Sequence, residues 1–184
     1  MNYIFDIGNV LLTYNPREYL DGMFADETVV DVLLHNIFLG DEWLMRDEGK
    51  LTQDEATEII CARIPQYTDE VKAAMGNVNK MFLPIEATIN HLPELKKAGH
   101  SLYYLSNISF ETRDYLVAKY DFFELFNGGV FSCDALLIKP NPEIYRLLLR
   151  KYNLNASDCI FYDDMKKNIA AAEKEGIKSV LVTR

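Results

Sequence analysis

Cysteine is scarce in this sequence, and long hydrophobic runs are absent. The three cysteines, Cys61, Cys133 and Cys159, are odd in number and far apart, so they fit neither a disulfide framework nor a zinc site. No apolar run approaches the roughly 20 residues of a membrane span. The first six residues carry no basic segment and do not resemble a signal peptide. The sequence therefore predicts a cytoplasmic protein with no membrane partner.

Positive charge is also in short supply. Lysine and arginine total 19 against 28 acidic residues, and this net charge of −9 argues against a nucleic-acid partner. The imbalance is local, because residues 14–82 hold six basic and fourteen acidic residues while the remainder is nearly balanced. A chain of 184 residues suits one domain, or one domain with an insert. We therefore predict a core of residues 1–13 and 83–184, with residues 14–82 inserted.

Short apolar runs alternate with helical patterns in the predicted core. The runs are rich in β-branched and aromatic residues and mostly lack polar alternation, as is typical of parallel strands covered on both faces. They lie at Tyr3–Phe5, Ser101–Leu105, Gly129–Phe131, Cys159–Tyr162 and Ser179–Val182. Helices are predicted at Pro84–Ala98, Phe110–Lys119, Pro142–Tyr152 and Met165–Glu175. This alternation predicts an α/β fold with a doubly wound parallel sheet.

The insert shows no strand pattern. Its predicted helices lie at Pro16–Phe24, Glu27–Phe38, Thr52–Arg63 and Asp69–Met81. Thr52 and Glu55 have the spacing of a capping box, which opens the third of these helices. An all-helical insert on an α/β sheet is typical of a lid or cap.

Polar residues follow the predicted strands. Asp6 follows the first strand, Ser106–Asn107 the second and Asp163–Asp164 the fourth, while Lys139 lies in the loop before a helix. Because open parallel sheets bind ligands outside the carboxyl ends of their strands, we expect a site there.

Each of these residues also has an ordinary structural explanation. Asp6 alone reads as a turn residue, and Lys139 as a solvated loop lysine. Ser106–Asn107 can cap the following helix, and Asp163–Asp164 can favour a helix N-terminus. Their joint position at one sheet edge favours the functional interpretation.

Four segments together resemble the motifs of the haloacid dehalogenase superfamily. They are Phe5–Val10, Leu105–Asn107, Lys139–Pro140 and Phe161–Asn168, in the order and at the strand positions that this family uses. The resemblance spans the whole chain and implies a Rossmann-like core with a helical cap. It also implies a phosphatase that forms an aspartyl-phosphate on Asp6.

The resemblance implies roles for the other residues of these segments. Asp6, Asp164 and the backbone carbonyl of Gly8 are expected to bind Mg²⁺. Ser106 and the backbone N–H of Asn107 are expected to hold phosphate oxygens.

Three further residues complete the expected site. Lys139 would neutralise charge on the phosphoryl group. Asp163 would orient the metal-bound waters, and Asn168, one helical turn beyond Asp164, would orient the site.

Gly8 is a departure from the family pattern, because most phosphatases of the superfamily carry a general acid/base aspartate there. Dehalogenases also lack it, but they work without Mg²⁺. An inactive or weakly active binding protein is a second possibility. We favour a third possibility, a resemblance to bacterial sugar-phosphate phosphatases such as α-glucose-1-phosphatases. These enzymes have the same first motif as Phe5–Val10 and are active with glycine at the position of Gly8. Thr13, Tyr14, a cap residue or a metal-bound water are candidates for the missing acid.

The stretch Gly40–Gly49 resembles the cap loop that faces the site in this branch. Trp43, Arg46 and Asp47 are candidates for contacts with a sugar or another leaving group, although Trp43 fits equally well in the core of the cap. The predicted partner is a small phosphorylated metabolite, and the chain is expected to be a monomer or a small homo-oligomer.

A non-enzymatic alternative is a regulatory module that accepts phosphate on an aspartate. Response-regulator receivers gather a similar set of residues, but with the acidic pair early in the chain and without a helical insert. Turnover of phosphate esters, in place of a stable phosphoaspartate, would separate the two.

Overall fold

The computed structural model describes residues 1–183 and contains a sheet of five parallel strands. The strands are β1 (Asn2–Phe5), β2 (Ser101–Ser106), β3 (Gly128–Phe131), β4 (Cys159–Asp163) and β5 (Lys178–Leu181). Their order is β3-β2-β1-β4-β5, so the chain builds outward from β1 and then returns to the other side of it. This order confirms the predicted doubly wound sheet, and each strand lies within two residues of its predicted position.

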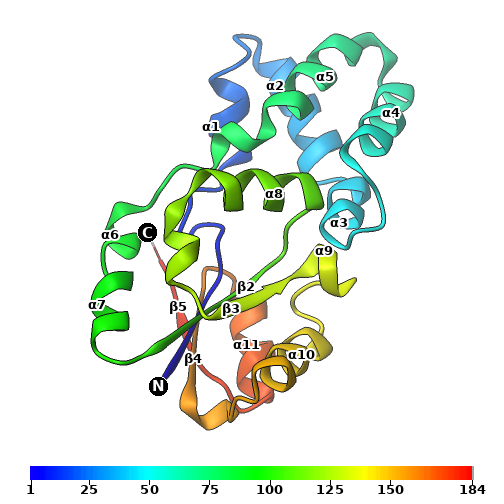
Figure 1. Ribbon diagram of the computed structural model, residues 1–184. Helices are drawn as coiled ribbons and strands as arrows, with labels where there is room; N and C mark the ends of the chain where they lie inside the picture. The colour runs from blue at the N-terminus through cyan, green and yellow to red at the C-terminus, as the bar shows by residue number, and fades with distance from the viewer. Residues whose placement is uncertain (184) are drawn as a thin grey trace.

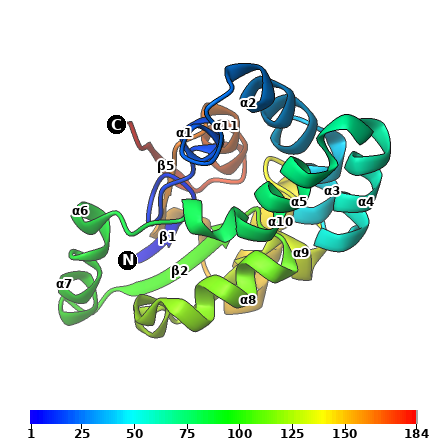
Figure 2. The same ribbon diagram turned by 90° about the horizontal axis from the view of Figure 1, so that it is seen from above.

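Helices cover both faces of the sheet. On one face pack α10 (Pro142–Tyr152) and α11 (Lys166–Lys174); on the other lie α6 (Glu86–Ile89), α7 (Leu92–Lys97), α8 (Phe110–Lys119) and the 3₁₀ turn η4 (Asp121–Leu125). Figure 2 shows α8 and α11 on opposite sides of β1 and β2. Alternate strand residues therefore enter different cores: Ile4 and Phe161 face α10 and α11, whereas Phe5 packs toward α7 and α8.

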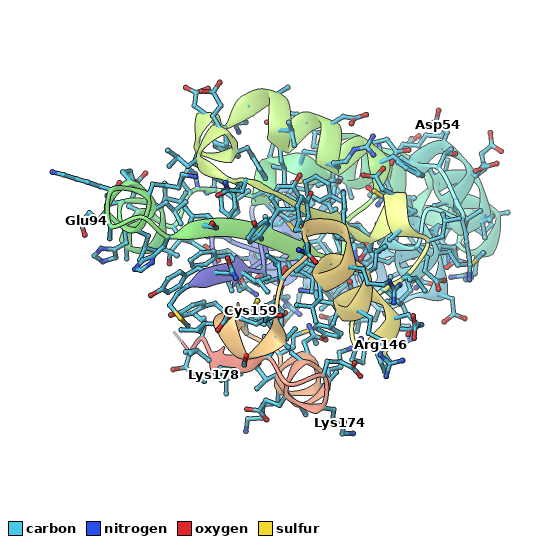
Figure 3. The ribbon with its side chains drawn as sticks, turned by 60° about the horizontal axis from the view of Figure 1, so that its bottom comes forward. Asp54, Glu94, Arg146, Cys159, Lys174 and Lys178 are labelled. Carbon is cyan, nitrogen blue, oxygen red and sulfur yellow. The ribbon has the colours of Figure 1, made fainter. Side chains whose placement is uncertain are left out.

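Charged side chains lie on the outer faces of these helices. Figure 3 shows Glu94, Arg146 and Lys174 pointing away from the sheet on α7, α10 and α11, whereas Cys159 begins β4 inside the molecule. A short 3₁₀ turn, η5 (Ala156–Asp158), leads into that strand.

The insert is entirely helical and lies above the carboxyl ends of the strands (Figure 1). Its α-helices are α1 (Pro16–Asp21), α2 (Glu27–Leu33), α3 (Asp41–Asp47), α4 (Gln53–Arg63) and α5 (Thr68–Asn77). The π-helix η1 (Leu34–Phe38) follows α2, and the 3₁₀ turns η2 (Pro65–Tyr67) and η3 (Val78–Met81) flank α5. The capping box of Thr52 and Glu55 is present at the start of α4, as predicted.

Several predicted helices end at other residues than expected, as α1 does at Asp21, and two predicted segments differ in their number of α-helices. Pro84–Ala98 is two short helices, because Pro93 near the start of α7 has no N–H to continue the helical ladder. The stretch expected to be a cap loop, Gly40–Gly49, contains α3, whose first turn carries Asp41 and Glu42, favourable at a helix N-terminus.

The chain passes between core and insert at two adjacent points. The Thr13 N–H donates to the Leu83 carbonyl at 2.8 Å, and the Leu83 N–H donates to the Thr13 hydroxyl at 2.9 Å. These bonds lie beside the predicted division at residues 13/14 and 82/83, which we retain as a proposal. Within residues 1–183, no helix combines the length and apolar character that crossing a bilayer requires.

Candidate active site

The carboxyl ends of β1, β2 and β4 open into a cavity of about 400 Å³. This volume is in the range of small-molecule sites. Asp6, Ser106, Lys139 and Asp164 line it from the core, beside the point where the strand order reverses. The structure thus brings the predicted motif residues together at the place where doubly wound sheets bind ligands.

A buried charge cluster forms the floor of the cavity. The Lys139 Nζ lies 2.9 Å from Asp6 Oδ1 and 2.7 Å from Asp163 Oδ2. Burial raises the pKa of Asp6 to about 6, with Lys139 opposing the rise and Asp163 adding to it. Burial lowers the pKa of Lys139, but its two carboxylate partners outweigh this and keep that pKa above its ordinary value. The lysine therefore stays charged beside the candidate nucleophile.

Neighbouring side chains fix both partners of this cluster. The Asn107 amide clamps the backbone of Lys139: its Nδ2 donates to the Lys139 carbonyl at 3.0 Å, and its Oδ1 accepts from the Lys139 N–H at 2.8 Å. Asp163, fully buried, accepts from the Asn168 amide at 3.0 Å and from the Met165 N–H at 2.8 Å. With Lys139 these donors occupy both Asp163 oxygens, which leaves that carboxylate a positioning group.

Oxygen atoms suited to a hard cation converge beside the cluster. One carboxylate oxygen from each of Asp6, Asp163 and Asp164 lies within 4.8 Å of the others. Since Asp163 is already saturated, Asp6 and Asp164 remain to bind a metal. Gly8 lines the same cavity. This all-oxygen donor set fits Mg²⁺.

Asn9 is a contributor that the sequence reasoning did not identify. Its Nδ2 donates to Asp164 Oδ2 at 3.0 Å, and its Oδ1 accepts from the Tyr14 N–H at 2.9 Å. Its backbone is left-handed, with φ of 55°, a conformation that asparagine tolerates better than most residues. The side chain thereby links the loop after β1 to the acidic pair after β4.

The cap side of the cavity is mainly apolar. Phe38, Trp43 and Leu44 line it together with Phe82 from the returning segment. Trp43 packs against Phe38 with ring centroids 4.7 Å apart, and is nearly buried. Trp43 is therefore both a core residue of the cap and a wall of the cavity.

Arg46 does not line the cavity. Its side chain is 1% exposed, with the guanidinium 4.9 Å from the centre of the Trp43 ring and Nη2 3.2 Å from the Ser109 hydroxyl. Glu111 lies 3.9 Å away and compensates part of the charge. Arg46 thus joins α3 to the first turn of α8, outside the lining of the cavity.

Asp47 does line the cavity, at the last position of α3. Its backbone carbonyl accepts a 2.6 Å hydrogen bond from the hydroxyl of buried Ser132. Burial raises the pKa of the Asp47 carboxyl to about 7; Arg46 opposes this rise, Asp6 adds to it, and Lys139 opposes it. The cap therefore places a carboxyl group with a raised pKa in the same cavity as the candidate nucleophile.

The haloacid dehalogenase-like hydrolase family model matches residues 38–182, most of the chain. The chain belongs to this family. A sesquiterpene phosphatase of Aspergillus oryzae is 27% identical over 180 residues, covering 98% of this chain and 88% of the relative.

Two solved structures of this family share the fold. One is a HAD family enzyme of Bacteroides thetaiotaomicron in complex with magnesium and inorganic phosphate (TM-score 0.77, 19% identity, 99% of this chain and 93% of the other). The other is the L-2-haloacid dehalogenase of Xanthobacter autotrophicus with chloropropionic acid covalently bound (TM-score 0.72, 17% identity, 100% and 77%). Since a family fold hosts more than one reaction, the choice between reactions rests on the site.

The structure excludes the alternative explanation of Ser106–Asn107 as a helix cap. Ser106–Asn107 does not cap α8; Ser109 does, accepting from the Thr112 N–H. Ser109 and Ser132 are contacts between core and cap that the motif left out. No sequence pattern marks them, because their partners on α3 are 63 and 85 residues away.

Proposed function

We propose that this protein is an Mg²⁺-dependent phosphatase that hydrolyses a small phosphate monoester through an aspartyl-phosphate on Asp6. The observation that carries the proposal is the joint placement of Asp6, its buried Lys139 partner and the Asp164 carboxylate at one cavity. A carboxylate nucleophile, a fixed cation and a metal site are the parts that phosphoryl transfer needs.

Asp6, Asp164 and the Gly8 carbonyl would hold the Mg²⁺ ion, which supplies charge neutralisation between the carboxylate and the phosphate when bound. The Asp6 oxygen forms a bond to phosphorus as the ester oxygen leaves with its electron pair. Ser106 and the Asn107 N–H hold the phosphoryl oxygens.

The remaining polar groups act by positioning. Lys139 balances the charge of the transferred phosphoryl group, and Asp163 with Asn168 fixes Lys139 in place. Arg46 sets the position of α3 through Ser109.

Dehalogenation is less well supported by this geometry. A carboxylate nucleophile and a cation serve both reactions, but a dehalogenase has no use for the metal-ready Asp164 that Asn9 holds at the cavity. A receiver module is also disfavoured, because receivers have the strand order 2-1-3-4-5 and this sheet does not.

The lining of the cavity bears on the substrate. A sugar phosphate remains the prediction from sequence, but a sugar needs many hydrogen-bonding partners, and the cap offers mainly Phe38, Trp43 and Leu44. This lining favours an ester whose alcohol is apolar. The similarity to a sesquiterpene phosphatase supports the same choice. The cytoplasmic location and the monomeric or small oligomeric state stay predictions from sequence.

The decisive experiment measures phosphate release from sugar, alkyl, prenyl and aryl phosphates, with Mg²⁺ and with a chelator. We expect Mg²⁺-dependent turnover, highest kcat/KM for an apolar ester, and loss of turnover in Asp6→Asn. Absence of turnover with every ester, or full activity in Asp6→Asn, would refute the phosphatase assignment. Preference for a sugar phosphate would restore the prediction from sequence, and halide release from 2-haloacids without metal would favour dehalogenation.

A further inference from the structure

A phosphatase acting on an unactivated alcohol ester needs a proton for the departing oxygen. Among residues 1–183, six titratable side chains line the cavity: Asp6, Tyr14, Asp47, Lys139, Asp164 and Lys167. Asp6 is the proposed nucleophile, Asp164 a proposed metal ligand, and the ammonium of Lys139 is fixed between two carboxylates. Lys167 is exposed to solvent, and burial raises the pKa of Tyr14 far above its ordinary value.

We propose that Asp47 is the catalytic acid and base of this site, delivered by the cap in place of a residue on the nucleophile loop. The inference rests on the proposed phosphatase function. Asp47 is the carboxyl group of the cavity that neither the nucleophile nor the metal site uses, and within the described chain its carboxyl oxygens have no hydrogen-bonding partner. They are therefore free to contact a substrate.

Contacts with one element of the core, α9 (Ser132–Ala135), fix the position of Asp47. The Ser132 hydroxyl bonds the Asp47 carbonyl and also accepts from the Ile108 N–H at 2.8 Å, next to the phosphate-binding motif. Helix α3 lies directly above α9 (Ser132–Ala135) in Figure 1. Gly49, which follows the helix with φ of 71°, approaches so closely that a Cβ there would lie 2.6 Å from the Cys133 carbonyl oxygen. The chain after α3 can therefore come this close to the core only because residue 49 is glycine.

Gly8, which has no side chain, lies on the nucleophile loop and lines the same cavity as Asp47. A Cβ built on Gly8 would lie 3.6 Å from the Cβ of Tyr14, in open van der Waals contact. Burial is the main cause of the raised pKa of Tyr14, and the negative charge of Asp47 adds to this rise. A side chain at position 8 would therefore meet Tyr14, and Gly8, Tyr14 and Asp47 all line the same cavity.

Charged groups around Asp47 set its protonation. Burial and, to a smaller extent, Asp6 on the loop after β1 favour the neutral acid, whereas Arg46 on α3 and Lys139 from the core favour the carboxylate. Tyr14 is the remaining titratable neighbour, and burial keeps it neutral. With a pKa of about 7, Asp47 exchanges a proton readily at neutral pH, as an acid/base group must.

The proton balance closes over two steps. In the first, Asp6 Oδ bonds to phosphorus, the ester P–O bond breaks, and the alcohol oxygen takes the proton of Asp47. In the second, water bonds to phosphorus and gives a proton to the Asp47 carboxylate, while the P–O bond to Asp6 breaks and its electron pair returns to Asp6. The products are the alcohol and inorganic phosphate, and Asp47 is protonated again.

The test compares two esters with the Mg²⁺-loaded full chain. 4-Nitrophenyl phosphate releases a stable anion that needs no proton, whereas hexyl phosphate releases an alkoxide that does. We expect Asp47→Asn to lower kcat/KM for hexyl phosphate about 10²–10⁴-fold and to affect 4-nitrophenyl phosphate at least tenfold less. The ratio between the two esters cancels any loss of folded protein. Asp41→Asn, the same change at the exposed start of α3, should leave both values unchanged.

The pH profile and a conservative variant give independent readings. For wild type, kcat/KM with hexyl phosphate should fall above about pH 7, because the donor loses its proton, and this fall should vanish in Asp47→Asn. Asp47→Glu should recover part of the hexyl phosphate activity. Equal losses on both esters with an unchanged pH profile would overturn the role of Asp47 and leave the phosphatase standing. Failure of wild type on both esters, and on the wider panel above, would overturn the phosphatase itself.

Discussion

Replacing Lys139 with methionine removes the positive charge that lies between two buried carboxylates. The ammonium is 2.9 Å from Asp6 and 2.7 Å from Asp163, and Lys139 itself is 2% exposed. Methionine has a similar length, so the change creates little cavity and mainly leaves the carboxylates unpaired. Removing one partner of a buried ion pair costs about 3–5 kcal/mol, and we expect Lys139→Met to lower the free energy of unfolding by that amount.

Urea unfolding at pH 8 in metal-free buffer, followed by circular dichroism, measures this loss. Lys72→Met is the matched control, because Lys72 is exposed on α5, and lysine and methionine have similar helix propensity. This variant should change the free energy of unfolding by less than about 0.5 kcal/mol. Excess Mg²⁺ should reduce the loss in Lys139→Met, since a cation bound at Asp6 would replace part of the missing charge.

A double-mutant cycle with Asp163→Asn isolates the interaction. The double variant should be more stable than the sum of the single losses predicts, by about 0.5–3 kcal/mol, because neutralising Asp163 removes one of the unpaired charges. Strict additivity, or a loss below about 1 kcal/mol in Lys139→Met alone, would refute the reasoning that this cluster is held by charge.

Three further predictions concern the nucleophile, the metal and the approach of the cap. Asp6→Asn should abolish phosphate release while circular dichroism stays that of wild type; retained turnover would exclude Asp6 as nucleophile. Asp164→Asn should raise the Mg²⁺ concentration for half-maximal activity more than Asp163→Asn does, because Asp163 is already saturated by protein donors; the reverse ranking in a Mg²⁺ titration would exchange their roles. Gly49→Ala should destabilise the protein by at least about 1–2 kcal/mol, since its left-handed backbone also lies against core atoms, whereas Gly76→Ala, with open space in α5, should stabilise it by about 0.5–1 kcal/mol; thermal unfolding compares the two.

The sheet and the motif residues were predictable because the relevant signals are local. Each strand is a short apolar run, and parallel strands bring their carboxyl ends to one edge wherever they lie in the chain. Asp6, Ser106 and Asp164 could therefore be placed together without any knowledge of side-chain contacts. Phe110–Lys119 and Pro142–Tyr152 were predicted at their observed bounds, and a proline marks the start of the second helix.

The remaining features depend on contacts between distant residues. Arg46 was a candidate for contact with a sugar or another leaving group, yet its partners Ser109 and Glu111 and the ring of Trp43 hold it inside the cap–core contact. The saturation of Asp163 likewise follows from Lys139, which is 24 residues away. A sequence shows that such groups exist, but it does not show which of them are already engaged.

The hydrogen bond from Ser132 to the Asp47 carbonyl has a consequence for timing. The chain crosses between core and cap beside Thr13 and Leu83, whereas α3 meets the core far along the chain from both crossings, through non-covalent contacts at Ser132 and Gly49. Any displacement that lifts α3 from the core withdraws the Asp47 carboxyl from Asp6 in the same motion. Docking of α3 on the core and placement of the Asp47 proton donor are therefore a single structural event. An ester that prevents α3 from docking would be bound beside the nucleophile without the catalytic acid.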